Sequence, residues 1–120
     1  MQDFFGTVVR NIGRGKQLGF PTANVDAQSS NTDGLYIAEI TIDSVTYPSL
    51  LFIGKAVTFG EEKRAHEVYI LDFNKDIYNQ QVSVHVIKKI RENKKFANAE
   101  ELITQMKMDE RFARTFFGIK

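Results

Sequence analysis

A twelve-residue stretch near the start of the sequence, GRGKQLGFPTAN at positions 13–24, concentrates glycine and positive charge. Its glycines allow the backbone to turn and to approach a ligand closely. Successive exposed amide groups bind anions, and Arg14 and Lys16 add positive charge, so phosphate is the obvious ligand. The spacing is neither GxxxxGK(S/T) nor GxGxxG. By residue type, the stretch is either a phosphate-binding loop or an ordinary flexible surface loop.

The end of this stretch, Pro21-Thr22-Ala23-Asn24, carries two hard oxygen ligands. Residues two apart on an extended segment point to the same side, so the Thr22 hydroxyl and the Asn24 amide oxygen can reach one Mg²⁺ ion. Magnesium takes few protein ligands and completes its shell with phosphate oxygens and water. The alternative is a turn in which both side chains bond to their own backbone.

A single carboxylate, Glu67, opens an otherwise apolar strand-like stretch after Ala65-His66. A carboxylate at the mouth of a strand can act as a general base. The alternative is a surface glutamate on an edge strand. We expect His66 to lie on the opposite face of the strand, and Asp72 and Asp76 have the positions of turn acids.

The segment Arg91-Glu92-Asn93-Lys94-Lys95-Phe96 combines cations with an aromatic side chain. Such a segment can cover a planar ligand. It can equally be a solvated connector in which Phe96 fills a gap in the core.

The elements that position these residues must fit into one small domain. The chain has 120 residues, a net charge of +1, no cysteine and two histidines. Its length suits a single domain spanning residues 1–120. The absence of cysteine excludes disulfides and thiolate sites, and two histidines disfavour a histidine metal cluster. The near-neutral charge disfavours a nucleic-acid coat protein, and no apolar run approaches the roughly 20 residues of a membrane span.

Five segments have the composition and alternation of β-strands. They are Phe5–Ile12, Leu35–Ile42, Thr46–Ile53, Glu67–Phe73 and Gln81–Ile90. The side chains expected to point inward are Tyr36, Ala38, Ile40 and Ile42 in the second segment and Val82, Val84 and Val86 in the last. Polar stretches at 26–33 and 60–64 are predicted loops.

The C-terminal part changes to a helical period. Asn98 is a good N-cap, and Glu101 completes a pattern like a capping box. Apolar residues then recur at helical spacing: Leu102, Ile103, Met106, Ala113, Phe116 and Phe117. The pattern predicts a helix over residues 99–117. Five or six strands followed by one helix favour an antiparallel barrel or sandwich with the helix packed outside.

Together these pieces resemble riboflavin kinase, in order and through nearly the whole chain from Gly6 to about Phe117. The matching pieces are Gly6-x-Val8-Val9, GRGKQLGFPTAN, Gly34-Leu35-Tyr36, Ile53-Gly54, EVYILDF at 67–73, Asp76-Ile77-Tyr78, Arg91-x-x-x-x-Phe96 and the helix after Ala99-Glu100-Glu101-Leu102. The resemblance implies a mainly β fold, a six-stranded antiparallel Greek-key barrel with a C-terminal α-helix. It implies Mg²⁺-dependent transfer of the γ-phosphate of ATP or another nucleotide to the 5′-hydroxyl of riboflavin, giving FMN.

The resemblance also implies a role for each site residue by its position. Glu67 matches the catalytic carboxylate, and Thr22 and Asn24 match the Mg²⁺ ligands. The implied nucleotide-binding residues are Asn11, Gly13, Arg14, Gly15, Lys16, Thr22, Ile70, Asp72 and Tyr78. The implied flavin-binding residues are Arg91, Lys94 and Phe96.

Four positions depart from the family pattern: Asn11 and Asn79 stand where glycine is usual, and Phe52 and Val57 replace Asn and Pro. These departures leave open a non-catalytic flavin- or FMN-binding regulatory module, and a small barrel that binds single-stranded nucleic acid is a third reading. We expect a cytoplasmic monomer with small-molecule substrates and no nucleic-acid or membrane partner. The chain is either a stand-alone kinase or one module of a protein that also carries an FMN adenylyltransferase domain.

Overall fold

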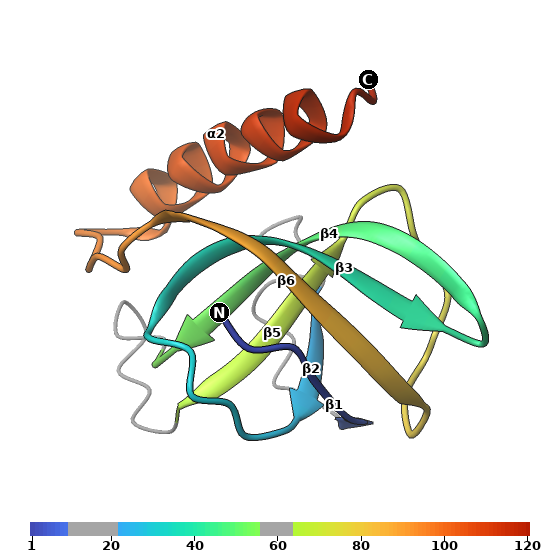
Figure 1. The fold of residues 1–120 in the computed structure, drawn as a ribbon. Helices are drawn as coiled ribbons and strands as arrows, with labels where there is room; N and C mark the ends of the chain where they lie inside the picture. Colours follow the sequence, from blue (N-terminus) through green and yellow to red (C-terminus); the bar gives the residue numbers. More distant parts are fainter. Residues whose placement is uncertain (10–21, 56–63) are drawn as a thin grey trace.

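The computed structural model describes residues 1–9, 22–55 and 64–120 and shows a closed barrel with a helix outside it (Figure 1). Its elements are β1 (Phe4–Val9), β2 (Ala23–Asp26), β3 (Gly34–Ile42), β4 (Val45–Gly54), β5 (Ala65–Ile70), β6 (Gln81–Arg91) and α2 (Ala99–Phe117). Paired strands are antiparallel, in the order β1-β2-β5-β4-β3-β6 around the barrel. Because β2 lies beside β5 and β6 lies beside β3, the connections are those of a Greek key. The predicted six-stranded barrel with a C-terminal helix is confirmed.

Period-2 alternation fills the inside of the barrel. All the side chains predicted to point inward are buried in one cluster: Tyr36, Ala38, Ile40, Ile42, Val82, Val84 and Val86. Ser83 and His85, on the other face of β6, are exposed as predicted. Strand β3 is buried on both faces, because Leu35 and Ile37 belong to a second cluster with Ala113 of α2. The helix therefore covers an apolar outer face of the barrel.

Helix α2 has the predicted bounds, and its ends are capped by side chains and glycine. The Asn98 side chain accepts a hydrogen bond from the Glu101 amide at 2.9 Å, and Gly118 ends the helix in the left-handed conformation at φ 69°. The Glu101 carboxylate accepts from the Ala97 amide, one residue before the N-cap. Of the predicted apolar face, Phe116 is 45% exposed, so the buried stripe is narrower than the sequence pattern suggested.

One strand ends earlier than predicted, and one strand, β2, is absent from the predicted set. The EVYILDF strand ends at Ile70 rather than at Phe73, because Asp72 adopts φ 55° in a turn. Strand β2 is four residues long, too short for its alternation to be recognised from the sequence. The predicted loop at 26–33 is confirmed for residues 27–33. The predicted strand residues 10–12 and loop residues 60–63 lie outside the described residues.

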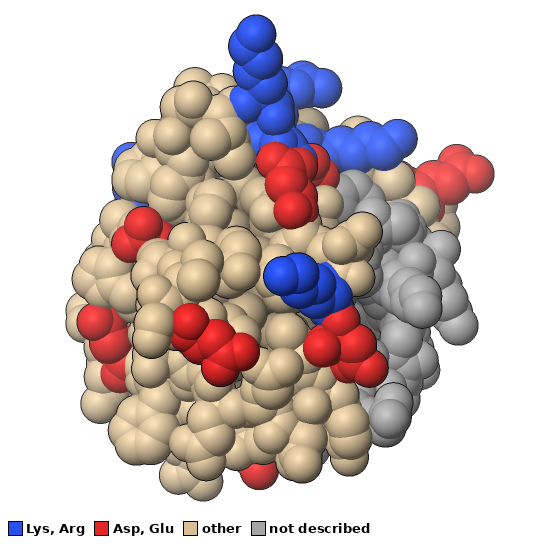
Figure 2. All heavy atoms as spheres, turned by 90° about the vertical axis from the view of Figure 1, so that its right-hand side faces the viewer, with Lys and Arg blue, Asp and Glu red and all other residues tan. Residues whose placement is uncertain are grey.

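The surface carries charges of both signs. On the face shown in Figure 2, basic side chains gather toward the top and acidic ones are scattered beneath them. In the described part of this face, no basic surface runs continuously across the barrel.

Candidate active site

Strands β2 and β5 bring together the two predicted metal ligands and the predicted general base. Asn24 is directly paired with Glu67, so their side chains share one face of the sheet. The Thr22 hydroxyl donates a hydrogen bond to Glu67 Oε1 at 2.8 Å. The neighbours Val25 and Val68 are buried inside the barrel, which places these three side chains on its outer face. Residues 45 apart in sequence are thus joined by one hydrogen bond.

On its other side, Glu67 borders the face that α2 covers. Phe52 of β4 is paired with Glu67 and packs against the outer cluster beneath the helix. Glu67 is half-buried at this border. A carboxylate in such a position can reach a bound substrate on one side while apolar side chains exclude water on the other.

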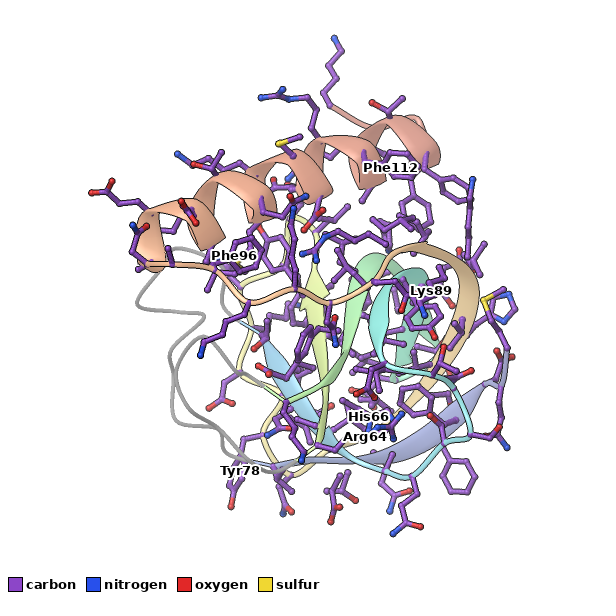
Figure 3. All side chains as sticks on the ribbon, turned by 90° about the vertical axis from the view of Figure 1, so that its left-hand side faces the viewer. Arg64, His66, Tyr78, Lys89, Phe96 and Phe112 are labelled. Carbon is purple, nitrogen blue, oxygen red and sulfur yellow. The ribbon has the colours of Figure 1, made fainter. Side chains whose placement is uncertain are left out.

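His66 points into the barrel, as predicted for the neighbour on the opposite face. Its side chain is buried, its Nε2 lies 2.9 Å from Ser29 Oγ, and its ring packs edge-on against Phe4. Burial lowers the pKa of His66, and the nearby Arg64 guanidinium lowers this pKa further. Figure 3 shows Arg64 and His66 close together. His66 therefore belongs to the barrel interior rather than to the outer site.

The donor set of the outer site fits a magnesium ion. It offers a hydroxyl oxygen from Thr22 and an amide oxygen from Asn24, both hard ligands of the kind that Mg²⁺ prefers, with the Glu67 carboxylate beside them. In its hydrogen bond to Glu67 the Thr22 hydroxyl is the donor, and a hydroxyl oxygen can also act as an acceptor or a metal ligand. Among the described residues, no group of three or more His, Cys, Asp or Glu side chains is arranged so that it could hold a metal ion.

The predicted nucleotide-binding residues fall in three places. Asn11, Gly13, Arg14, Gly15 and Lys16 lie outside the described residues, and Thr22 lies at the outer site. The remaining three surround the end of β5 and the start of β6. Ile70 is buried in the barrel core, and Tyr78 is 45% exposed at the lower edge of Figure 3. The Tyr78 amide donates to Asp76 Oδ1, which confirms Asp76 as a turn acid.

Asp72, the third of these residues, is held by the C-terminal helix. Arg114 donates to both of its carboxylate oxygens, at 2.8 Å and 3.1 Å. These hydrogen bonds hold the pKa of Asp72 below its ordinary value. Arg114 also donates to Glu110, which accepts a hydrogen bond from Tyr69, and burial raises the pKa of Tyr69 to about 12. Sequence reasoning missed Arg114, whose helical position gives no signal of a partner in a distant turn.

The predicted flavin-binding residues lie between β6 and α2. Arg91 forms a bidentate ion pair with Asp109 of α2, in which the closest N–O distance is 2.7 Å. Lys94 is exposed, with Nζ 5.6 Å from the centre of the Phe96 ring. Phe96 lies beneath the start of α2 (Figure 3). The resemblance pointed to Arg91 but missed Asp109, although an acid between Met106 and Ala113 falls on the inward face of the helix and calls for a cation.

The family of this chain follows from comparison with known proteins. Residues 2–117 match the family model for riboflavin kinase, also called flavokinase. The chain belongs to the riboflavin kinase family. The resemblance read from the sequence is thereby confirmed, and the barrel with its C-terminal helix is the fold of this family.

Several of the proteins that this chain resembles are named riboflavin kinase, and the curated relatives are longer chains. The chain is 39% identical over 115 residues to the trifunctional protein RibF/MnmA of Mycoplasmoides gallisepticum, covering 93% of this chain and 18% of that protein. It is 37% identical over 117 residues to the bifunctional riboflavin kinase/FMN adenylyltransferase of Escherichia coli K12, covering 95% and 37%. The crystal structure of riboflavin kinase from Trypanosoma brucei matches with a TM-score of 0.64 and 26% identity, covering 98% and 82%. The chain thus spans well under half of the two curated relatives.

No helix in the described part of the chain is long and apolar enough to cross a membrane.

Proposed function

We propose that this riboflavin kinase domain transfers the γ-phosphate of a nucleoside triphosphate, with ATP as the expected donor, to the 5′-hydroxyl of riboflavin, giving FMN. The observation that carries the proposal is the convergence of Thr22, Asn24 and Glu67 on one face of two paired strands. Phosphoryl transfer requires a metal ion that stabilises charge on the phosphates and a residue that orients the attacking hydroxyl, and these three side chains could supply both.

Glu67 is the general base of this proposal. Its carboxylate orients the ribityl 5′-hydroxyl and accepts the proton as that oxygen attacks the γ-phosphorus. The new O–P bond forms while the bond between the γ-phosphorus and the β,γ-bridging oxygen breaks, and the nucleoside diphosphate leaves. The Thr22 hydroxyl holds Glu67 in place through the 2.8 Å hydrogen bond, because positioning supplies much of the rate in this reaction class.

Thr22 and Asn24 are the residues that would hold Mg²⁺, which when bound would balance charge on the phosphate oxygens. The glycines and cations at 13–16 are proposed to cover the nucleotide phosphates. Ile70, Asp72 and Tyr78 would line the nucleotide side, and Arg91, Lys94 and Phe96 the flavin side. Arg91 would act there as an anchor, since its guanidinium is engaged by Asp109.

The test is to incubate the chain with riboflavin and MgATP, and separately with MgCTP, and to separate riboflavin from FMN by chromatography. FMN formation with either nucleotide is expected. Riboflavin binding without FMN formation would instead support the non-catalytic regulatory module. The expectations of a monomer, of a cytoplasmic location and of no nucleic-acid partner stay predictions.

A further inference from the structure

The side chain of Asn93, in the segment between β6 and α2, is held at the end of β4 by a hydrogen bond and a close backbone contact. We call this position, formed by Ile53 and Gly54, the seat of Asn93. Its Nδ2 group donates a hydrogen bond to the Ile53 carbonyl oxygen at 2.9 Å. The next residue, Gly54, has φ 148°, and a β-carbon added there would clash with Asn93 Nδ2. A glycine at this position therefore lets the carboxamide reach the strand backbone.

The other half of this carboxamide lacks a partner. Asn93 Oδ1 is buried and has no hydrogen-bond partner among the described residues. Rotating the amide by 180° does not help, because two carbonyl oxygens would then face each other. Buried acceptors in folded proteins are paired in the large majority of cases, because an unpaired one is costly. A seat that positions the oxygen and leaves it unpaired indicates that a donor arrives with a ligand.

The seat lies beside the candidate active site. Ile53 is paired with His66, and the preceding residue, Phe52, is paired with Glu67. Adjacent strands are about 4.8 Å apart, so the anchor of Asn93 is one strand away from the proposed base. A ligand that presents a hydroxyl to Glu67 can therefore extend to Asn93 with its other end.

We propose that Asn93 Oδ1 accepts a hydrogen bond from the imide N–H of the isoalloxazine ring, which makes Asn93 a specificity-determining residue for the flavin. The inference rests on the proposed function for its choice of ligand. The imide is the only N–H group of the oxidised ring, and the remaining ring heteroatoms are acceptors. An amide oxygen whose donor half is already committed to Ile53 complements this group and rejects a ring that lacks it.

The test compares riboflavin with N3-methylriboflavin, which has no imide N–H. Dissociation constants are measured without nucleotide, by quenching of flavin fluorescence, for the wild type, Asn93→Ala and the matched control Lys95→Ala, an exposed residue of the same segment. The wild type and the control are expected to bind N3-methylriboflavin about tenfold or more weakly than riboflavin. Asn93→Ala is expected to bind the two within about threefold of each other. A wild-type ratio near one, or an equal ratio in Asn93→Ala, would mean that a water molecule satisfies this oxygen and would overturn the proposal.

A second measurement uses the wild-type chain alone and does not depend on how the variants fold. The imide proton of riboflavin labelled with ¹⁵N at N3 is expected to move downfield and to exchange slowly with solvent when bound, whereas fast exchange would refute the contact. FMN formation is assayed separately. If FMN forms but Asn93 has no effect on the preference for riboflavin over N3-methylriboflavin, the proposed role of Asn93 is refuted and the kinase activity stands. If Asn93 determines this preference but no FMN forms, the role of Asn93 stands and the kinase activity is refuted.

Discussion

At the scale of single residues, the site depends on a polar row at the border of an apolar face. Glu67 alternates with the buried residues His66 and Val68, so the pleat that fills the barrel also directs the carboxylate outward. There it meets the Thr22 hydroxyl. The alternative of a surface glutamate on an edge strand does not hold, because Glu67 is half-buried and its strand, β5, is paired with β2 on one side and β4 on the other.

Replacing Glu67 with Gln should remove the base and keep the shape of the side chain. We expect kcat to fall by roughly 10²–10⁴-fold, the usual contribution of a general base, with little change in the unfolding midpoint. FMN formation at saturating substrates measures this, with Glu100→Gln on the exposed first turn of α2 as the control. Near-normal turnover would exclude Glu67 from proton transfer.

The Thr22 hydroxyl should contribute through its oxygen rather than through its bulk. Thr22→Val keeps the volume and loses the hydrogen bond to Glu67, so kcat should fall about tenfold or more. Thr22→Ser restores a hydroxyl and should recover most of the loss. Magnesium titrations of both variants should show a higher Mg²⁺ requirement for the valine variant, and equal requirements would argue against Thr22 as a ligand.

At the scale of elements, α2 is tied to the barrel by ion pairs as well as by apolar contact. Ala113 is the one apolar side chain of the helix that is fully covered, whereas Met108, Phe112 and Phe116 are about half exposed. Polar anchors therefore matter more than the apolar sequence pattern suggests. Asp109 holds Arg91 at the end of β6, and Arg114 holds Asp72 at the turn after β5.

The Asp109–Arg91 pair should contribute strongly to stability. Asp109→Ala leaves a largely buried guanidinium without its carboxylate, and we expect a loss of about 3 kcal/mol in the free energy of unfolding. Urea denaturation measures this loss. Arg91→Met combined with Asp109→Ala should recover part of it, because no unpaired charge then remains. A double variant less stable than the sum of the single changes would contradict this account.

At the scale of the whole molecule, the barrel buries a histidine that the unfolded chain exposes to water. The ordinary pKa of histidine, near 6.5, is lowered for His66 in the fold, so the unfolded chain binds the proton more readily. By linkage, stability is complete above this ordinary value and falls as the pH drops below it toward the lowered folded pKa.

We therefore expect the urea midpoint to decrease from pH 7.5 to pH 5, and His66→Gln to flatten this dependence. Lys95→Ala, a change of an exposed residue between β6 and α2, supplies the control and should keep the wild-type slope. An unchanged slope in His66→Gln would show that other groups govern the acid sensitivity.

Patterns in the sequence were sufficient to predict the fold class, the helix and the residue types of the site. Alternation and capping act over neighbouring residues, so the inward residues of β3 and β6 and the span of α2 could be predicted from local pattern. The motifs of the family pointed to Thr22, Asn24 and Glu67 individually.

Which of these residues meet depends on how the strands and the helix pack in three dimensions. The pairing of Asn24 with Glu67, the Arg91–Asp109 and Arg114–Asp72 pairs and the seat of Asn93 all join distant parts of the chain. Strand register and helix docking set these contacts, and both follow from the packing of the whole barrel rather than from any local pattern. The residue type at each site position can therefore be read from the local sequence, whereas the residue that it contacts depends on how the barrel closes.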